Sequence, residues 1–135
     1  MPKPPVLAQL TWKHGLVFDA TSGTQAVVLD GDSAEGPSPV QTLVLSIAGC
    51  MAADLAHILT KGRIAFRAIR AEVVADRAQE NPHRIVSVAL RFQIEGSVPP
   101  AAVDRAIALS RDTYCSVWHS MRQDIQFTTS FEIVA

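Results

Sequence analysis

Hydrophobic and polar residues alternate along much of this chain, and one long apolar segment interrupts the alternation. The segment begins at Ser38, a favourable N-cap, and ends at Lys61, which precedes a glycine. Pro39 suits the first helical position, and Gln41 completes an S-x-x-Q capping box. We therefore predict a central helix over Ser38–Lys61. Its apolar residues cover most of the helical circumference, so we expect it to be buried on nearly all sides.

Three short alternating segments precede this helix, at residues 6–12, 16–20 and 25–29. Turn-forming residues separate them, at His14-Gly15 and at residues 21–24. Alternation with a period of two is typical of strands with one buried face. The pattern therefore predicts a three-stranded meander at the N-terminus.

The segments after the helix predict a hairpin, two further helices and a last strand. In chain order, these segments are residues 66–77 and 84–95, then 101–112 and 113–123, then 125–133. The hairpin and the last strand alternate, whereas the two segments between them carry apolar residues at helical spacing. The order β3-α-β2-α2-β contains no repeat or linker, and it predicts a single α+β domain over residues 1–135.

Composition and charge narrow the possible partners and the location. Lysine and arginine total 12 against 13 acidic residues, so no basic surplus is present to hold nucleic acid. The first residues, MPKPPV, lack the apolar core of a signal peptide, which predicts a cytoplasmic protein. Polar residues interrupt the central helix, so we do not expect a membrane span. A hydrophobic fraction of 48% favours apolar surface that is buried in an oligomer.

Two cysteines are the main candidates for chemically reactive residues. No glycine-rich nucleotide motif or G-x-S-x-G elbow is present, and the four histidines lack metal-ligand spacing. Cys50 and Cys115 each lie on a predicted helix. A reactive thiolate and a second thiol are what thiol redox chemistry requires. Two inert buried thiols are the alternative, and sequence spacing does not decide whether the two sulfurs meet.

The surroundings of both cysteines resemble the OsmC/Ohr family of thiol-dependent peroxidases, in its OsmC-like branch. The similar stretches are GPSPVQTLVLSIAGCMAADL, TYCSVWHSMRQDIQFTTSFEI and, in the meander, LTWKHGLVFDATSGTQAVVLDG. The resemblance implies an intertwined homodimer with active sites at the subunit interface and a function in oxidative stress. It also implies that Cys50 attacks an organic hydroperoxide and that Cys115 resolves the sulfenic acid as a disulfide. An external dithiol would reduce this disulfide, and no cofactor would be bound.

The chain departs from the family pattern at the groups that activate the thiolate. The resemblance implies an arginine in the N-terminal hairpin, held by a glutamate on the central helix. Here no arginine precedes Arg63, and Gln41 stands at the glutamate position. Lys13 and His14 are the basic residues of the hairpin, and His119 follows Cys115 by one helical turn, so each of them is a candidate for activating or positioning a thiol.

The alternative function is an OsmC-like protein of weak catalytic activity. Such a protein would bind a small apolar or thiol-reactive ligand at the dimer interface. The missing arginine and the glutamine at position 41 motivate this alternative, because lysine and glutamine do not reproduce a bidentate arginine–carboxylate pair.

Overall fold

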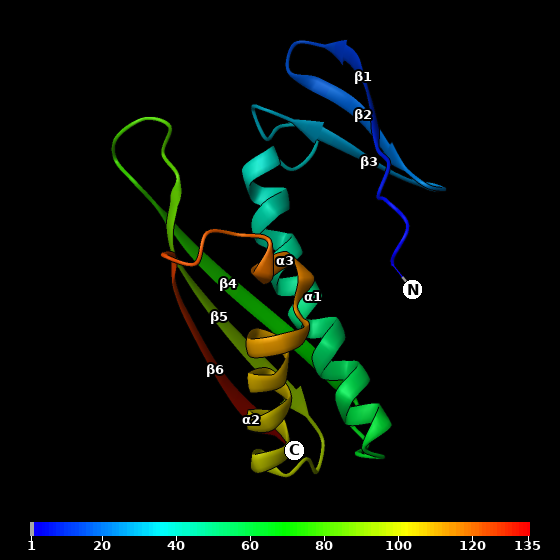
Figure 1. Cartoon of the computed structure of the whole chain (residues 1–135), viewed down its shortest axis with the longest axis vertical. Helices are drawn as coiled ribbons and strands as arrows, with labels where there is room; N and C mark the ends of the chain where they lie inside the picture. Colours follow the sequence, from blue (N-terminus) through cyan, green and yellow to red (C-terminus); the bar gives the residue numbers. More distant parts are fainter. Residues whose placement is uncertain (1) are drawn as a thin grey trace. The chain divides into compact units, whose positions relative to one another are not determined.

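The computed structural model describes residues 2–135, and its elements occur in the predicted order (Figure 1). They are β1 (Gln9–His14), β2 (Val17–Ser22), β3 (Gln25–Asp30), α1 (Pro39–Lys61), β4 (Ala68–Arg77), β5 (Ile85–Glu95), α2 (Pro100–Leu109), a π-helical turn η1 (Ser110–Tyr114), α3 (Ser116–His119) and β6 (Gln126–Val134). The α+β class is confirmed. The chain forms two compact units that divide after Leu43, within α1, and each is described by itself. A single domain over residues 1–135 stays a prediction.

The N-terminal unit is the predicted meander, an antiparallel sheet in the order β1-β2-β3. Its first strand begins at Gln9, later than the predicted residue 6. Gln9 pairs with Thr21, and β2 ends one residue further on, at Ser22. Residues before Ala8 therefore have no strand residue opposite them, and Val6 stays 89% exposed despite its apolar character. Pairing decides where this strand starts, and the hydrophobic pattern does not.

The loop between β3 and α1 is organised by the carboxylate of Asp30, which is 2% exposed. Its oxygens accept hydrogen bonds from the backbone N–H groups of Asp32 (2.8 Å), Ala34 (3.1 Å) and Glu35 (2.9 Å). The N–H groups of Glu35 and Asp32 are the main reason that the pKa of Asp30 lies below its usual value of 3.8. A buried charge is tolerated here because the backbone satisfies it.

The predicted capping box opens α1. The backbone N–H of Gln41 donates to Ser38 Oγ at 3.1 Å, and the N–H of Ser38 donates to Gln41 Oε1 at 2.8 Å. The hydroxyl of Ser33 donates to the same Gln41 oxygen at 2.6 Å. The Gln41 side chain therefore accepts two hydrogen bonds at the helix start, and this confirms its structural role.

The C-terminal unit places one layer of helices against one face of a sheet with the strand order β4-β5-β6 (Figure 1). β4 and β5 form the predicted antiparallel hairpin, whereas β5 and β6 are parallel. A parallel pair needs a crossover, and here α2, η1 and α3 supply it. The core comes from α1, β5 and α2, with the buried residues Ile47, Met51, Leu55, Leu59, Val88, Leu90, Phe92, Ile94, Val103, Ala106 and Ile107.

Burial of α1 is confined to one stripe, so the expected burial on nearly all sides is not met within one chain. The four buried residues recur every fourth position, from Ile47 to Leu59. Leu43 and Leu45 remain 40% and 60% exposed. A single layer of sheet can cover only one side of a helix, and for this reason the other apolar positions lie open.

By length and composition alone, α1 is also apolar enough to cross a membrane, with a mean hydropathy of 1.7 over 18 residues. A core helix of a soluble protein passes the same test. The prediction that this helix does not span a membrane stays a prediction.

The predicted helix over residues 113–123 is wrong. α2 ends at Leu109, the chain continues as the π-helical turn η1, and α3 covers only Ser116–His119. Between η1 and α3, Cys115 has an extended backbone with φ −71° and ψ 99°. Apolar spacing did not reveal this break, because buried residues recur before and after Cys115, at Ser110 and Trp118.

Candidate redox site

Cys50 lies in the middle of α1, at the edge of the buried stripe. It precedes the buried Met51 by one residue and follows the buried Ile47 by three, so its side chain is half-buried. The regular helix fixes the direction of the Cα–Cβ bond at this position. Cys50 is therefore rigidly held while part of its surface stays open to solvent.

Cys115 is fully buried and occupies the N-cap of α3. Its backbone N–H donates to the carbonyl of Ser110 at 2.7 Å, in the i→i+5 pattern of a π-helix. Its sulfur accepts a hydrogen bond from the N–H of Trp118 at 3.3 Å, and its carbonyl accepts one from the N–H of His119 at 3.0 Å. Backbone groups before and after Cys115 thus fix the position of its sulfur.

The two thiols meet. Both cysteines are free, and Cys50 lies close enough to Cys115 to influence the titration of its thiol. Burial is the main cause that raises the pKa of Cys115 to about 11, and the contact with Cys50 raises it further, against the lowering effect of the Trp118 N–H. Cys115 is therefore held as a protonated thiol. The half-buried Cys50 is the member of the pair that a reagent from solvent can reach.

A hydrogen bond between Asp54 and Ser110 ties the two cysteine-bearing segments together. Asp54 lies one turn after Cys50, and its Oδ2 accepts the hydroxyl proton of Ser110 at 2.7 Å. Ser110 is fully buried and begins η1, the turn that leads to Cys115. This contact holds η1 against α1, next to the pair of sulfurs.

Sequence reasoning did not assign Ser110 a role in the site. One feature of the sequence could have revealed this role: Ser110 places a hydroxyl on the apolar stripe of the second predicted helix. A buried hydroxyl needs a partner, so this position pointed to a polar group on a facing element. The structure supplies this partner as Asp54 of α1.

Trp118 holds α3 against the sheet. Its ring lies 4.6 Å from that of Phe127 in β6, measured between centroids, with the planes tilted by 53°. Trp118 also donates the backbone hydrogen bond to Cys115 sulfur. Aromatic packing on β6 therefore supports the position of the buried thiol.

The other candidate residues have the following places. Lys13 pairs with Asp19 (Nζ to Oδ1, 3.7 Å) and His14 with Glu35 (Nε2 to Oε2, 3.1 Å), both inside the N-terminal unit. The imidazole of His119 is exposed and forms no hydrogen bond or ion pair with any of residues 2–135. A role for Lys13, His14, Gln41 or His119 in activating or positioning a thiol stays a prediction.

Comparison with known proteins assigns the family. The profile described as OsmC-like protein matches residues 30–130, which include both cysteines, the strands β4 and β5 and the first part of β6. The chain belongs to the OsmC-like family. Among curated relatives of this OsmC-like protein, YhfA of Escherichia coli K12 is 34% identical, over 95% of this chain and 98% of its own length. The predicted family is thus confirmed.

Solved structures confirm the OsmC-like fold. A protein of Aquifex aeolicus has a TM-score of 0.90 at 22% identity, with 97% of each chain covered. A Legionella pneumophila protein, described as an organic hydroperoxide resistance protein OsmC, has a TM-score of 0.72 at 13% identity, over 98% of this chain and 99% of its own. At these identities the likeness concerns the fold alone.

The raised pKa of Cys115 predicts a distinct pH dependence of alkylation in this OsmC-like protein. Below pH 9, the thiolate fraction of Cys115 is about a hundredfold smaller than that of a cysteine with the ordinary pKa of 9.0. The alkylation rate of Cys115 should therefore keep rising tenfold per pH unit towards about 11. Iodoacetamide labelling followed by peptide mass spectrometry measures this rate.

Urea-unfolded protein is the control for the alkylation experiment, since both cysteines should then react alike. Burial slows the alkylation of Cys115 at every pH. The prediction is therefore tested by how the rate changes with pH, and not by its absolute value. A Cys115 rate that levels off near pH 9 in the folded protein contradicts the prediction.

Proposed function

We propose that this OsmC-like protein reduces organic hydroperoxides with the Cys50–Cys115 pair, in the cytoplasm and without a bound cofactor. The thiolate of Cys50 attacks the terminal peroxide oxygen, the O–O bond breaks, and the alkoxide takes a proton and leaves as an alcohol. Cys50 is then a sulfenic acid. The sulfur of Cys115 attacks the Cys50 sulfur, and the S–S bond forms as the hydroxyl leaves with the Cys115 proton as water. An external dithiol reduces the disulfide.

The observation that carries this proposal is the contact of two thiols in unlike environments. Cys50 is half-buried, whereas Cys115 is fully buried and its pKa is raised. A peroxide from solvent would reach Cys50 first, and Cys115 already lies where the resulting sulfenic acid needs a partner. The name of the Legionella pneumophila relative, an organic hydroperoxide resistance protein, agrees with this chemistry.

The proposal is tested by following the loss of cumene hydroperoxide in the presence of dithiothreitol. Wild-type protein should consume the peroxide faster than the same concentration of Cys50→Ser. After peroxide treatment without reductant, mass spectrometry should find a Cys50–Cys115 disulfide. Equal peroxide loss with both proteins would end this proposal.

A second candidate is the catalytically weak protein that binds a small apolar or thiol-reactive ligand at a dimer interface. It is favoured by the hydrogen bonds of Gln41, whose side chain is already engaged by Ser33 and Ser38. Titration of Cys50 by its ultraviolet thiolate absorbance separates the two candidates. A pKa near the free value of about 8.5 favours ligand binding, and a strongly depressed pKa favours the peroxidase.

We further propose that two chains associate through the open faces of α1. Its exposed apolar positions, Leu43 and Leu45, are the support for this proposal, since an unpaired apolar face tends to be covered. In sedimentation-velocity runs, the wild type should behave as a dimer and Leu45→Glu should shift towards monomer. Val74→Glu on β4 makes the same change at a residue that is 64% exposed, and it should leave the dimer intact. A monomeric wild type contradicts the proposal.

A further inference from the structure

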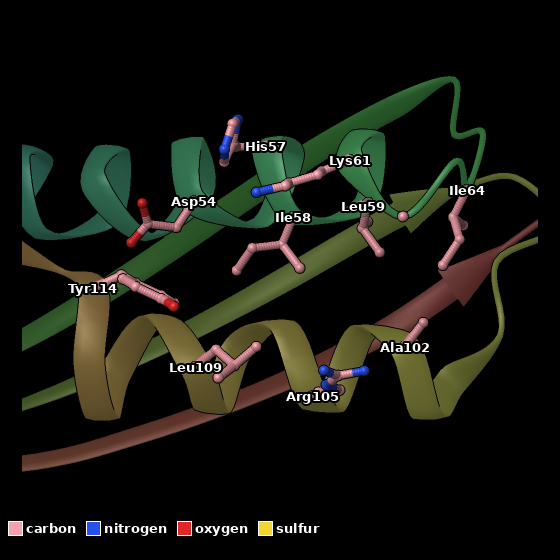
Figure 2. Close-up of a pocket in the computed structure, with 11 residues that line it drawn as sticks. Asp54, His57, Ile58, Leu59, Lys61, Ile64, Ala102, Arg105, Leu109 and Tyr114 are labelled. Carbon is pink, nitrogen blue, oxygen red and sulfur yellow. The ribbon is translucent and has the colours of Figure 1, made fainter.

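A groove of about 670 Å³ runs between α1 and α2 in the C-terminal unit (Figure 2). Its volume falls within the roughly 300–1,000 Å³ that is typical of small-molecule sites. Neither Cys50 nor Cys115 lines it. The lining residues are Asp54, His57, Ile58, Leu59, Lys61, Gly62, Ile64, Ala102, Arg105, Leu109 and Tyr114. The groove is therefore a feature that the proposed redox chemistry does not use.

Two cationic side chains of the groove have no partner. Lys61 comes from α1 and Arg105 from α2, and neither forms a hydrogen bond or ion pair through its side chain with any of residues 2–135. The basic residues Lys13, Arg67, Arg70, Arg91, Arg111 and Arg122, in contrast, each lie within salt-bridge distance of a carboxylate. The groove thus carries two cationic groups that have no ion-pair partner among residues 2–135.

The one carboxylate among the lining residues lies at one end. Asp54 is next to Tyr114 in Figure 2, and its Oδ2 already accepts the hydroxyl proton of Ser110. An anion would be repelled from this end and attracted towards Lys61 and Arg105. Figure 2 shows the Lys61 side chain lying back along α1 over Ile58, so its ammonium group borders the middle of the groove.

The end of the groove away from Asp54 is apolar. Leu59, Ile64 and Ala102 gather there in Figure 2, while Ile58 and Leu109 line the middle from opposite helices. An apolar wall beside two free cations suits a ligand with an anionic head and a hydrophobic body. A purely polar anion would leave this wall in contact with water.

We propose that the groove binds a small anionic amphiphile, a carboxylate or phosphate ester with a medium-length apolar body. The head group lies in the middle of the groove, between the cations of Lys61 and Arg105, and the body covers Ile64 and Ala102. The site is independent of hydroperoxide turnover, because it uses none of the groups that the redox mechanism requires.

Isothermal titration calorimetry with octanoate, octyl phosphate and octanol tests the site. Both anions share the recognised chemistry, and their relative affinities distinguish a carboxylate from a phosphate ligand. Octanol should bind at least about fivefold more weakly than the better anion, since it lacks the charge. Shortening octanoate to hexanoate should weaken binding by about fourfold per buried methylene. Binding of octanol as tight as that of both anions would overturn the proposal.

Two variants and one matched control locate the ligand. Lys61→Gln and Arg105→Gln should each weaken octanoate binding by about fivefold. Arg63→Gln removes the same charge two residues from Lys61, but Arg63 does not line the groove. This variant should therefore bind octanoate with the affinity of the wild type. Equal affinities in all four proteins, or no octanoate binding to the wild type, would refute the site.

Two further variants separate this site from the rest of the molecule. Cys50→Ser should bind octanoate like the wild type, so failure of the peroxidase proposal leaves this proposal standing. Ala102→Trp fills the apolar end of the groove and should abolish binding, with circular dichroism to confirm that the helices are kept. Unchanged binding in Ala102→Trp would contradict the placement of the apolar body.

Discussion

Replacement of Cys50 by serine should lower dithiol-dependent hydroperoxide turnover by roughly a thousandfold or more, because a hydroxyl cannot replace the attacking thiolate. The effect should be large because Cys50 is the only thiol of the pair that is open to solvent. Cys115, buried and with its pKa raised to about 11, should not substitute for it at neutral pH. Stopped-flow consumption of cumene hydroperoxide, compared with a protein-free blank, measures the loss.

Cys115→Ser is the matched control for this prediction. It keeps the attacking thiol, so one equivalent of peroxide should still be consumed rapidly, and a sulfenic acid should accumulate that dimedone traps. The wild type should instead form a disulfide and give little dimedone adduct. If Cys115→Ser fails to consume its first equivalent, or if Cys50→Ser consumes one, the assigned order of attack and resolution is wrong.

Phe92→Ala should lower the free energy of unfolding by about 3–5 kcal/mol, because it empties the centre of the core. Phe92 is fully buried in β5, the middle strand of its sheet, where it lies opposite Ala71 of β4 and Phe131 of β6. Neither alanine nor a small shift of the strands refills this space. Urea denaturation followed by circular dichroism, at one fixed protein concentration, measures the change.

Val74→Ala serves as the comparison for the core substitution. Val74 lies on the edge strand β4 and is 64% exposed, so its truncation should change the free energy of unfolding by less than about 0.5 kcal/mol. Equal losses for Phe92→Ala and Val74→Ala would contradict the assignment of β5 as the centre of the core.

Much of the fold could be predicted because local signals agree with the tertiary structure. The capping box at Ser38 and Gln41 specified the start of α1 through side-chain and backbone hydrogen bonds within four residues. Strict alternation in β5 identified the stripe from Val88 to Ile94 that faces the helices. Such features depend on neighbouring residues along the chain, and for this reason they can be predicted from the sequence alone.

The geometry around Cys115 could not be predicted in the same way. The contacts that define it join segments far apart in the chain, as in the hydrogen bond from Ser110 to Asp54 and the contact of Cys115 with Cys50. In η1 the backbone N–H bonds to the carbonyl five residues earlier instead of four, and this change leaves the apolar pattern of the sequence unaltered. The family resemblance predicted that Cys50 and Cys115 act as a pair, whereas the hydrophobic pattern of the sequence did not.

The parallel pairing of β5 with β6 makes the redox pair a reporter of folding. Cys115 lies in the crossover between these strands, so its sulfur lies near Cys50 when the crossover is packed against α1. In an unfolded chain the two thiols meet at the low effective concentration of a long loop, whereas in the native chain they are in contact. The rate at which a mild oxidant couples them therefore reports the fraction of molecules in which this non-local contact is formed.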